Sequence, residues 1–222
     1  SIYRTISFCK EIGSYNASTQ EDNPQYHNHN LYEYNEYNDA LWRQIGLTKE
    51  RIKSLTSIHL IGAGTSWHAA RIAQFFFESI CNIHTHVHLA SEFRYMSFFA
   101  DPNSLYIALS QSGETSDILE AVRLVNSFEH HTIAITNVTS STLVREASGF
   151  LPMQAGPEIS GSSTKAFSTE LAVLYWLTHC IALETGKITQ AQMYQAEEAL
   201  LVAAEILEAS IETHKFKIIQ EI

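Results

Sequence analysis

Cysteine and basic residues are scarce in this 222-residue chain, and each scarcity excludes a class of protein. The three cysteines, Cys9, Cys81 and Cys180, show no C-x-x-C spacing, which argues against a disulfide framework and favours a reducing cytosol. The 14 Lys and Arg residues are outnumbered by 24 Asp and Glu residues, so the formal net charge is −10. Without a basic cluster, neither nucleic acid nor an anionic membrane surface is an expected partner.

Long apolar runs and targeting signals are also missing. No stretch of the sequence reads as the roughly 20 consecutive apolar residues that span a bilayer. The first residues, Ser1 to Arg4, carry no signal-peptide pattern, so we expect a cytoplasmic protein without a membrane partner. The chain begins with Ser rather than Met, which favours a piece of a longer protein.

Apolar material is plentiful, at 45% of residues against 17% charged, which suits one folded domain with a sizeable core. Three regions are expected along the chain. Residues 1–57 form a polar arm and a lead-in helix, and the Asn- and Tyr-rich stretch 23–38 reads as a connector. Residues 58–185 form the main domain. Residues 186–222 form a C-terminal helix or connector.

Short apolar runs alternate with amphipathic stretches through the main domain. The runs predict five strands, at 58–61, 85–90, 105–109, 132–136 and 150–153. Helices are expected at 65–81, 115–129 and 140–147, followed by two long helices within 161–213 that are broken near Gly186. This alternation predicts an α/β fold, a three-layer αβα sandwich around a five-stranded parallel sheet, with helical extensions at both ends.

Ligands of parallel sheets bind beyond the carboxyl ends of the strands, so the loops there are the first place to look for a site. The first loop is Gly62-Ala63-Gly64-Thr65-Ser66, whose glycines allow a close backbone approach to a ligand. A dinucleotide fingerprint would place a third glycine where Trp67 stands, and Glu92 comes late for a ribose-binding acid. A dinucleotide-binding oxidoreductase is therefore a disfavoured alternative.

The second loop, Ser110-Gln111-Ser112-Gly113-Glu114-Thr115, opens the amphipathic helix at 115–129. Helix N-terminal N–H groups and small hydroxyls can together hold a phosphate without a lysine. The G-x-x-x-x-G-K-[ST] pattern of a P-loop is absent. The alternative is an ordinary helix cap by Ser112 or Thr115 without any ligand.

The third loop, residues 160–165, again sets hydroxyls and a glycine at a helix start, now with Lys165. Three such loops at one edge of a sheet suit a ligand with many hydroxyls and one anionic group. Neutral donors would bind it, because the region 58–183 holds few basic residues. These are Arg71, Arg94, Arg123, Arg145 and Lys165.

The region 58–183 resembles a sugar isomerase (SIS) domain, more narrowly the first of two such domains in the isomerase half of the glucosamine-6-phosphate synthase (glutamine–fructose-6-phosphate aminotransferase) family. The matching runs are Gly64-Thr65-Ser66, A-S-E-F-R-Y at 90–95, S-Q-S-G-E-T at 110–115, S-S-T-L-V-R-E at 140–146 and S-T-K-A-F at 163–167. Two positions depart from the family pattern: Ala63 replaces a cysteine, and Gly161 replaces an apolar residue.

The resemblance implies binding of fructose 6-phosphate or glucosamine 6-phosphate, no metal, no cofactor and a homodimer. It places Thr65 and Ser66 on the sugar and the second loop around the phosphate. The implied substrate-binding residues are Gly64, Thr65, Ser66, Ser110, Gln111, Ser112, Gly113, Thr115, Gly161, Ser163 and Lys165.

No catalytic residue is expected in this chain. The family's base glutamate, ring-opening histidine and amine-handling lysine belong to the second SIS domain, which lies outside this sequence. Glu114 and Glu158 are the nearest acidic candidates here, and both read as structural. The resemblance therefore implies a chain that binds a sugar phosphate without isomerising it. A stand-alone sugar-phosphate sensor is the other open alternative.

One further pattern is compatible with a metal site. His84, His86 and His88 alternate along a predicted strand and would share one face of the sheet. Same-face neighbours on a strand are about 6.5–7 Å apart, which makes a tetrahedral site of three in-line histidines difficult. A partly exposed strand face is the expected outcome.

Overall fold

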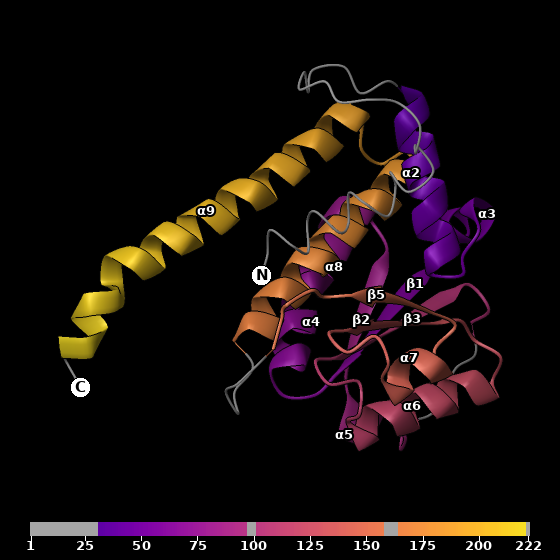
Figure 1. The fold of residues 1–222 in the computed structure, drawn as a ribbon. Helices are drawn as coiled ribbons and strands as arrows, with labels where there is room; N and C mark the ends of the chain where they lie inside the picture. Colours follow the sequence, from indigo (N-terminus) through magenta and orange to yellow (C-terminus); the bar gives the residue numbers. More distant parts are fainter. Residues whose placement is uncertain (1–30, 97–100, 158–163, 221–222) are drawn as a thin grey trace.

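The computed structural model describes residues 31–96, 101–157 and 164–220, and a parallel sheet lies at its centre (Figure 1). The sheet has five strands in the order β2-β1-β3-β4-β5, and every neighbouring pair runs parallel. The strands are β1 (Ser57–Gly62), β2 (His84–Leu89), β3 (Ser104–Ser110), β4 (Thr132–Thr136) and β5 (Gly149–Pro152).

Helices cover both faces of this sheet. In chain order they are α2 (Leu31–Gln44), α3 (Lys49–Lys53), α4 (Thr65–Phe76), the π-helical turn η1 (Phe77–Cys81), α5 (Ala90–Phe93), α6 (Ser116–Ser127), α7 (Thr142–Glu146), α8 (Lys165–Glu184) and α9 (Gln190–Gln220). Figure 1 shows α4 and α8 on one side of the sheet and α5, α6 and α7 on the other.

Successive side chains of a strand point to opposite faces of the sheet, and they pack into two separate cores, one on each face. On β1, Ile58 and Leu60 join the larger core beneath α4 and α8, whereas Ile61 joins the smaller core beneath α6. Because β3 and β4 are buried along their whole length, their residues read as continuous apolar runs. The three-layer α/β fold expected from the sequence is confirmed.

Element boundaries differ from the expectations in three places. The stretch 23–38 reads as a connector in the sequence, but α2 begins at Leu31 and takes up its second half. The helix expected at 65–81 widens into η1 at Phe77 and ends at Asn82, which adopts a left-handed conformation with φ 54°. The short helix α5 has no counterpart among the expected elements. The predicted break near Gly186 lies between α8 and α9, and Gly186 has φ 69°.

We expected from the sequence that no segment is long and apolar enough to cross a membrane, and helix α8 shows that this expectation was wrong. By length and composition, Lys165–Glu184 is such a helix, but 72% of its most apolar window is buried inside the structure. Its side chains Leu174, Leu177 and Ile181 are fully buried in the larger core. Burial of this kind is typical of the central helix of a globular domain.

The two cysteines in the described residues are buried thiols. Neither Cys81 nor Cys180 forms a disulfide in the described part of the chain, and both belong to the larger core. The Cys81 thiol donates a hydrogen bond to the Thr178 carbonyl at 3.1 Å, and burial raises its pKa to about 12. An inert, protonated thiol of this kind serves as a small apolar core residue.

Candidate functional site

The strand order fixes where a ligand site is to be sought. The chain passes from β1 to β2 on one side, and then returns to place β3 on the other side of β1. This reversal is a topological switch point, and ligands of open parallel sheets bind beyond the carboxyl ends of the strands that flank it. The loops that leave β1 and β3 are the first and second loops singled out in the sequence.

The loop between β3 and α6 is held in shape by its own hydroxyl groups. The Gly113 N–H donates to Ser110 Oγ at 3.0 Å, and Ser110 Oγ lies 3.2 Å from Thr115 Oγ1. The Glu114 N–H donates to Ser112 Oγ at 3.2 Å. The hydroxyls of Ser110 and Ser112 thus fold the loop and are positioned beside the start of α6.

The first turn of α6 is left open by this arrangement. Thr115 is the N-cap residue, yet its side chain accepts no hydrogen bond from the helix. The cap alternative raised from the sequence, in which Ser112 or Thr115 closes the helix end, is therefore not found among the described residues. The N–H groups of the first helical turn and the positive end of the helix dipole remain available to an anion.

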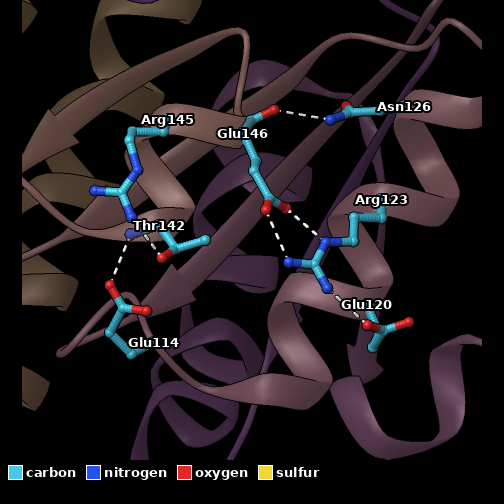
Figure 2. A network of polar contacts seen from close by, with 7 residues as sticks. All are labelled: Glu114, Glu120, Arg123, Asn126, Thr142, Arg145 and Glu146. Carbon is cyan, nitrogen blue, oxygen red and sulfur yellow. Dashed lines mark hydrogen bonds and ion pairs between the residues drawn. The ribbon is translucent and has the colours of Figure 1, made fainter.

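Three backbone N–H groups bind the same loop to α7 and to the segment before α7, and Figure 2 shows the contact between Thr142 and Glu114. The Thr142 N–H donates to Glu114 Oε1 at 2.7 Å, the Leu143 N–H donates to the Gly113 carbonyl at 3.0 Å, and the Asn137 N–H donates to the Gln111 carbonyl at 3.1 Å. The hydrogen bond from Thr142 lowers the pKa of Glu114. Glu114 is thus an ionised carboxylate at the N-terminus of α7, which agrees with the structural role expected for it.

The arginines around this loop are bound to other groups (Figure 2). Arg123 forms a bidentate pair with Glu146, at 2.8 and 2.9 Å, and its third nitrogen donates to Glu120 at 2.8 Å. These carboxylates raise the pKa of Arg123 further above its already high value. Arg145 donates to Thr142 Oγ1 and to the Ser140 carbonyl. An anion at the start of α6 would accordingly meet mainly neutral donors.

The loop after β1 begins helix α4 without a side-chain cap. Gly64 is its N-cap residue, with φ 55°, and no side-chain hydrogen bond closes the helix end. Thr65 is the first residue of α4 and is half-buried. Ser66 is buried and donates its hydroxyl hydrogen to Glu170 Oε1 of α8 at 2.7 Å.

Glu170 is a residue that the sequence reasoning misses. Its side chain is fully buried, Oε2 has no hydrogen-bond partner, and burial raises the pKa of the carboxyl group to about 7. The available signal is an acidic residue among positions that are otherwise apolar, since Ala166, Val173 and Leu174 share its side of α8.

Helix α8 begins at Lys165, in the third loop predicted from the sequence. The ammonium group of Lys165 donates to the Pro157 carbonyl at 3.2 Å. Gly161 and Ser163, and also Glu158, lie outside the described residues. The structure thus places Gly64, Thr65, Ser66, Lys165 and the loop 110–115, and leaves the centre of the third loop as an expectation.

The histidine face of β2 includes a fourth histidine from the neighbouring strand. His59 of β1 lies with its Nδ1 2.9 Å from His88 Nε2, and its ring stacks on His86 and on Tyr106. Burial lowers the pKa of His59 to about 3 and that of His88 to about 4. Within the described ranges, no group of three or more His, Cys, Asp or Glu residues is arranged to hold a metal ion.

Comparison with known proteins gives the sequence relatives of this chain. Glutamine–fructose-6-phosphate aminotransferase (isomerizing) from Methanosarcina mazei is 42% identical over 147 residues, which cover 66% of this chain and 24% of the relative. The enzyme of the same name from Haemophilus ducreyi is 44% identical over 144 residues, covering 64% of this chain and 24% of the relative. The chain therefore spans about a quarter of the length of these curated relatives.

Solved structures of related proteins share the fold of this chain. The C-terminal domain of glucosamine-fructose-6-phosphate aminotransferase from Francisella tularensis superposes with a TM-score of 0.71 at 28% identity, covering 89% of this chain and 60% of that chain. Glucosamine-6-phosphate deaminase from Thermotoga maritima shares the fold with a TM-score of 0.61 at 24% identity, covering 82% of this chain and 56% of that chain.

The family match covers the sheet and the helices that carry all three candidate loops. Residues 52–180 match the SIS domain. This range starts in α3 and ends near the end of α8, so it includes every strand and the starts of α4, α6 and α8. The chain belongs to the SIS domain family and is homologous to the SIS domains of glutamine–fructose-6-phosphate aminotransferases.

Proposed function

We propose that this chain binds fructose 6-phosphate or glucosamine 6-phosphate at the carboxyl edge of its sheet. The observation that carries the proposal is the uncapped first turn of α6, which adjoins the hydroxyls of Ser110, Ser112 and Thr115. N–H groups, the helix dipole and neutral hydroxyls together stabilise a phosphate dianion without a basic side chain. The homology with aminotransferases that act on fructose 6-phosphate supports the choice of ligand.

Each part of the ligand has its own contacts in this proposal. The phosphate group is bound by Ser110, Gln111, Ser112, Gly113 and Thr115. The sugar hydroxyls are bound by Gly64, Thr65 and Ser66 after β1, and by Gly161, Ser163 and Lys165 at the start of α8. The units involved are an arm at 1–57, the binding domain at 58–185 and a connector at 186–222.

The reaction of the relatives requires more than binding. Isomerisation of a ketose phosphate moves a proton between C1 and C2, so a base must lie within hydrogen-bond reach of these carbons. Glu114 is unsuited to that role because its carboxylate is held by the N-terminus of α7. We therefore propose that the chain supplies the sugar-phosphate-binding half of an isomerising aminotransferase and is inactive by itself.

The two alternatives raised from the sequence are not favoured. A dinucleotide-binding oxidoreductase would share its sheet and its first glycine loop, but the curated relatives of this chain are aminotransferases. A stand-alone sensor would need the same binding site, so the binding test below applies to it as well. Stabilisation of the chain by NAD but by neither sugar phosphate would overturn the proposal.

Alanine variants of the second loop test the proposed phosphate contacts. Ser112→Ala and Thr115→Ala each remove one hydroxyl next to the phosphate, and a hydrogen bond to a charged group contributes about 1.5–3 kcal/mol. We expect about tenfold or greater loss of fructose 6-phosphate affinity for each, measured by calorimetry. Ser127→Ala at the opposite end of α6 is the matched control, since its hydroxyl bonds only the Leu124 carbonyl. Unchanged affinity in both loop variants would contradict the proposed phosphate contacts and would leave the loop with a structural role alone.

We further propose that the chain forms a homodimer through α9. The buried side of this helix, defined by Met193, Ala196 and Ala204, continues at helical spacing through Leu207 and Ile211. Leu207 is 46% exposed and Ile211 is 66% exposed, because α9 runs away from the body of the molecule (Figure 1). A second copy would cover the exposed end of this apolar stripe.

A further inference from the structure

Glu170 is a fully buried acidic residue for which the proposed site gives no role. It lies on α8 where α8 packs against α4, and it is fully buried. Oε1 accepts the Ser66 hydrogen bond at 2.7 Å, whereas Oε2 has no partner. A half-satisfied carboxylate in apolar surroundings is costly, so its presence calls for an explanation.

Ser66 connects this carboxyl group to the candidate site. It is the second residue of α4 and directly follows Gly64 and Thr65 in the loop that leaves β1. A hydroxyl group has one hydrogen to donate and lone pairs to accept with. When Glu170 is ionised, it takes the Ser66 hydrogen, and only the lone pairs of Ser66 Oγ are left for a ligand. A protonated Glu170 can donate to Oγ instead, which frees the Ser66 hydrogen.

We propose that Glu170 is a positioning residue of the sugar-phosphate site, whose protonation turns the Ser66 hydroxyl from an acceptor into a donor toward the ligand. The inference rests on the proposed function, because it requires a ligand with anionic or carbonyl oxygens at the loop after β1. Such oxygens accept hydrogen bonds, so they favour the state in which Ser66 donates. By linkage, binding of the ligand then takes up a proton at Glu170.

The ionisation of Glu170 falls in the range where such a switch operates. Burial raises its pKa to about 7, against a smaller lowering by the Ser66 hydrogen bond. Other titratable groups lie on α8 and on the elements packed against it. They include Lys165, Tyr175, His179, Cys180 and Glu184 of α8, His68 and Arg71 of α4, Glu78 and Cys81 of η1, Lys49, Glu50, Arg51 and Lys53 of α3, and Tyr194, Glu197, Glu198, Glu205, Glu208 and Glu212 of α9. Within the described part of the chain, the pKa of Glu170 responds to burial and to Ser66 and to none of these groups.

Calorimetric titration with fructose 6-phosphate between pH 6 and 9 tests the proposal by comparing the unmodified chain with Glu170→Gln. The glutamine amide can donate to Ser66 Oγ and carries no charge, so it imitates the protonated acid at every pH. The phosphate group of the ligand titrates equally in both experiments and cancels in the ratio. If the ligand raises the Glu170 pKa by one unit, the unmodified chain loses about tenfold in affinity relative to the variant over this range.

Two further variants show whether the effect passes through Ser66. Glu184→Gln makes the same chemical change at the far end of α8, where Glu184 contacts Trp42 and Lys53, and should follow the pH profile of the unmodified chain. Ser66→Ala binds more weakly, and its affinity should no longer depend on whether residue 170 is Glu or Gln. Circular dichroism confirms that each variant is folded at the pH of each titration.

The possible results separate the two proposals. A relative loss of affinity above pH 7 that disappears in Glu170→Gln, together with proton uptake in buffers of different ionisation enthalpy, supports the role of Glu170. Parallel pH profiles for the unmodified chain and Glu170→Gln overturn it and leave the proposed function intact. If neither protein binds fructose 6-phosphate or glucosamine 6-phosphate at any pH, the proposed function fails and the inference fails with it.

Discussion

Gly113 is the residue on which the shape of the second loop depends most directly. Its φ of 65° lies in the left-handed region, and a Cβ atom added there would meet Ser141 Oγ at 2.2 Å and Ser141 Cβ at 2.5 Å. Both conditions favour glycine, since any other residue would be strained and would also push the loop away from α7.

Gly113→Ala should therefore destabilise the chain and weaken ligand binding together. Left-handed strain costs about 1–2 kcal/mol, and overpacking adds about 1–3 kcal/mol. Gly156→Ala is the matched control, because Gly156 also has positive φ, 74°, but no atom lies within 4 Å of the added Cβ. Urea unfolding of both variants measures the difference. Equal losses in the two variants would mean that the contact with Ser141 relaxes without cost.

His59 contributes to the sensitivity of the folded chain to acid, as does its neighbour His88. Its pKa is lowered from 6.5 to about 3 by burial, so the folded chain holds it neutral. Such a histidine contributes stability above pH 6.5, and that stability is lost as the pH falls toward the folded value.

His59→Phe should reduce the loss of stability between pH 7 and 5 by about 1–2 kcal/mol, because phenylalanine keeps the ring stacked on Tyr106 and has no proton to bind. Melting temperatures measured across this range give the comparison. His84→Phe makes the same substitution at the exposed end of the same face and serves as the matched control. If His59→Phe loses as much stability between pH 7 and 5 as the unmodified chain, the acid sensitivity comes from other groups.

At the scale of elements, α9 is distinguished by an apolar stripe that continues beyond the part of the helix that packs against the rest of the chain. Leu207→Glu places a charge on the continuation of the buried side, and we expect it to dissociate a dimer into monomers. Ile206→Glu is the matched control: Ile206 is 60% exposed, but it points to another side of the helix. Sedimentation equilibrium at several concentrations gives the mass of each variant. A monomeric unmodified chain, or a dimer that survives Leu207→Glu, would contradict the assignment.

At the scale of the whole molecule, the fold was predictable because short apolar runs alternate with amphipathic segments along the chain. The runs at 132–136 and 105–109 are continuous and apolar, and β3 and β4 are buried on both faces. By contrast, the start of α2 was hidden in a stretch of Asn and Tyr, which have weak helix preferences. Helical structure there follows from tertiary packing of Leu41 and Trp42, which the local sequence does not reveal.

The candidate site was predictable to the extent that it consists of consecutive residues. Loop 110–115 could be read directly, since its hydroxyls, its glycine and the following helix are adjacent in the chain. Glu170 and His59 could not, because each acquires its character from residues far away in sequence. Ser66 lies 104 positions from Glu170, and His88 lies 29 positions from His59. Only the packing of α4 on α8, and of β1 beside β2, brings these pairs together.

The isolated chain should bind fructose 6-phosphate and fail to convert it. Because we propose that the chain binds the phosphate group but does not supply the base for isomerisation, incubation with fructose 6-phosphate and either ammonia or glutamine should yield no glucosamine 6-phosphate by mass spectrometry. A full-length aminotransferase of the same family provides the positive control. Product formation above that of a Ser112→Ala, Thr115→Ala double variant would show that this chain contains a catalytic base of its own.

The position of β1 between β2 and β3 also has a consequence for how the chain is made. Of the strands in this sheet, β1 leaves the ribosome first, yet its two partners begin 27 and 47 residues later, as the pairs Ser57–His84 and Ser57–Ser104 show. Neither ladder of β1 can close until distant sequence has been synthesised, and loop closure of this kind slows folding. The nascent chain therefore carries β1 unpaired until β2 emerges, and one edge of β1 stays open until β3 follows, so apolar strand edges are exposed to aggregation during this interval.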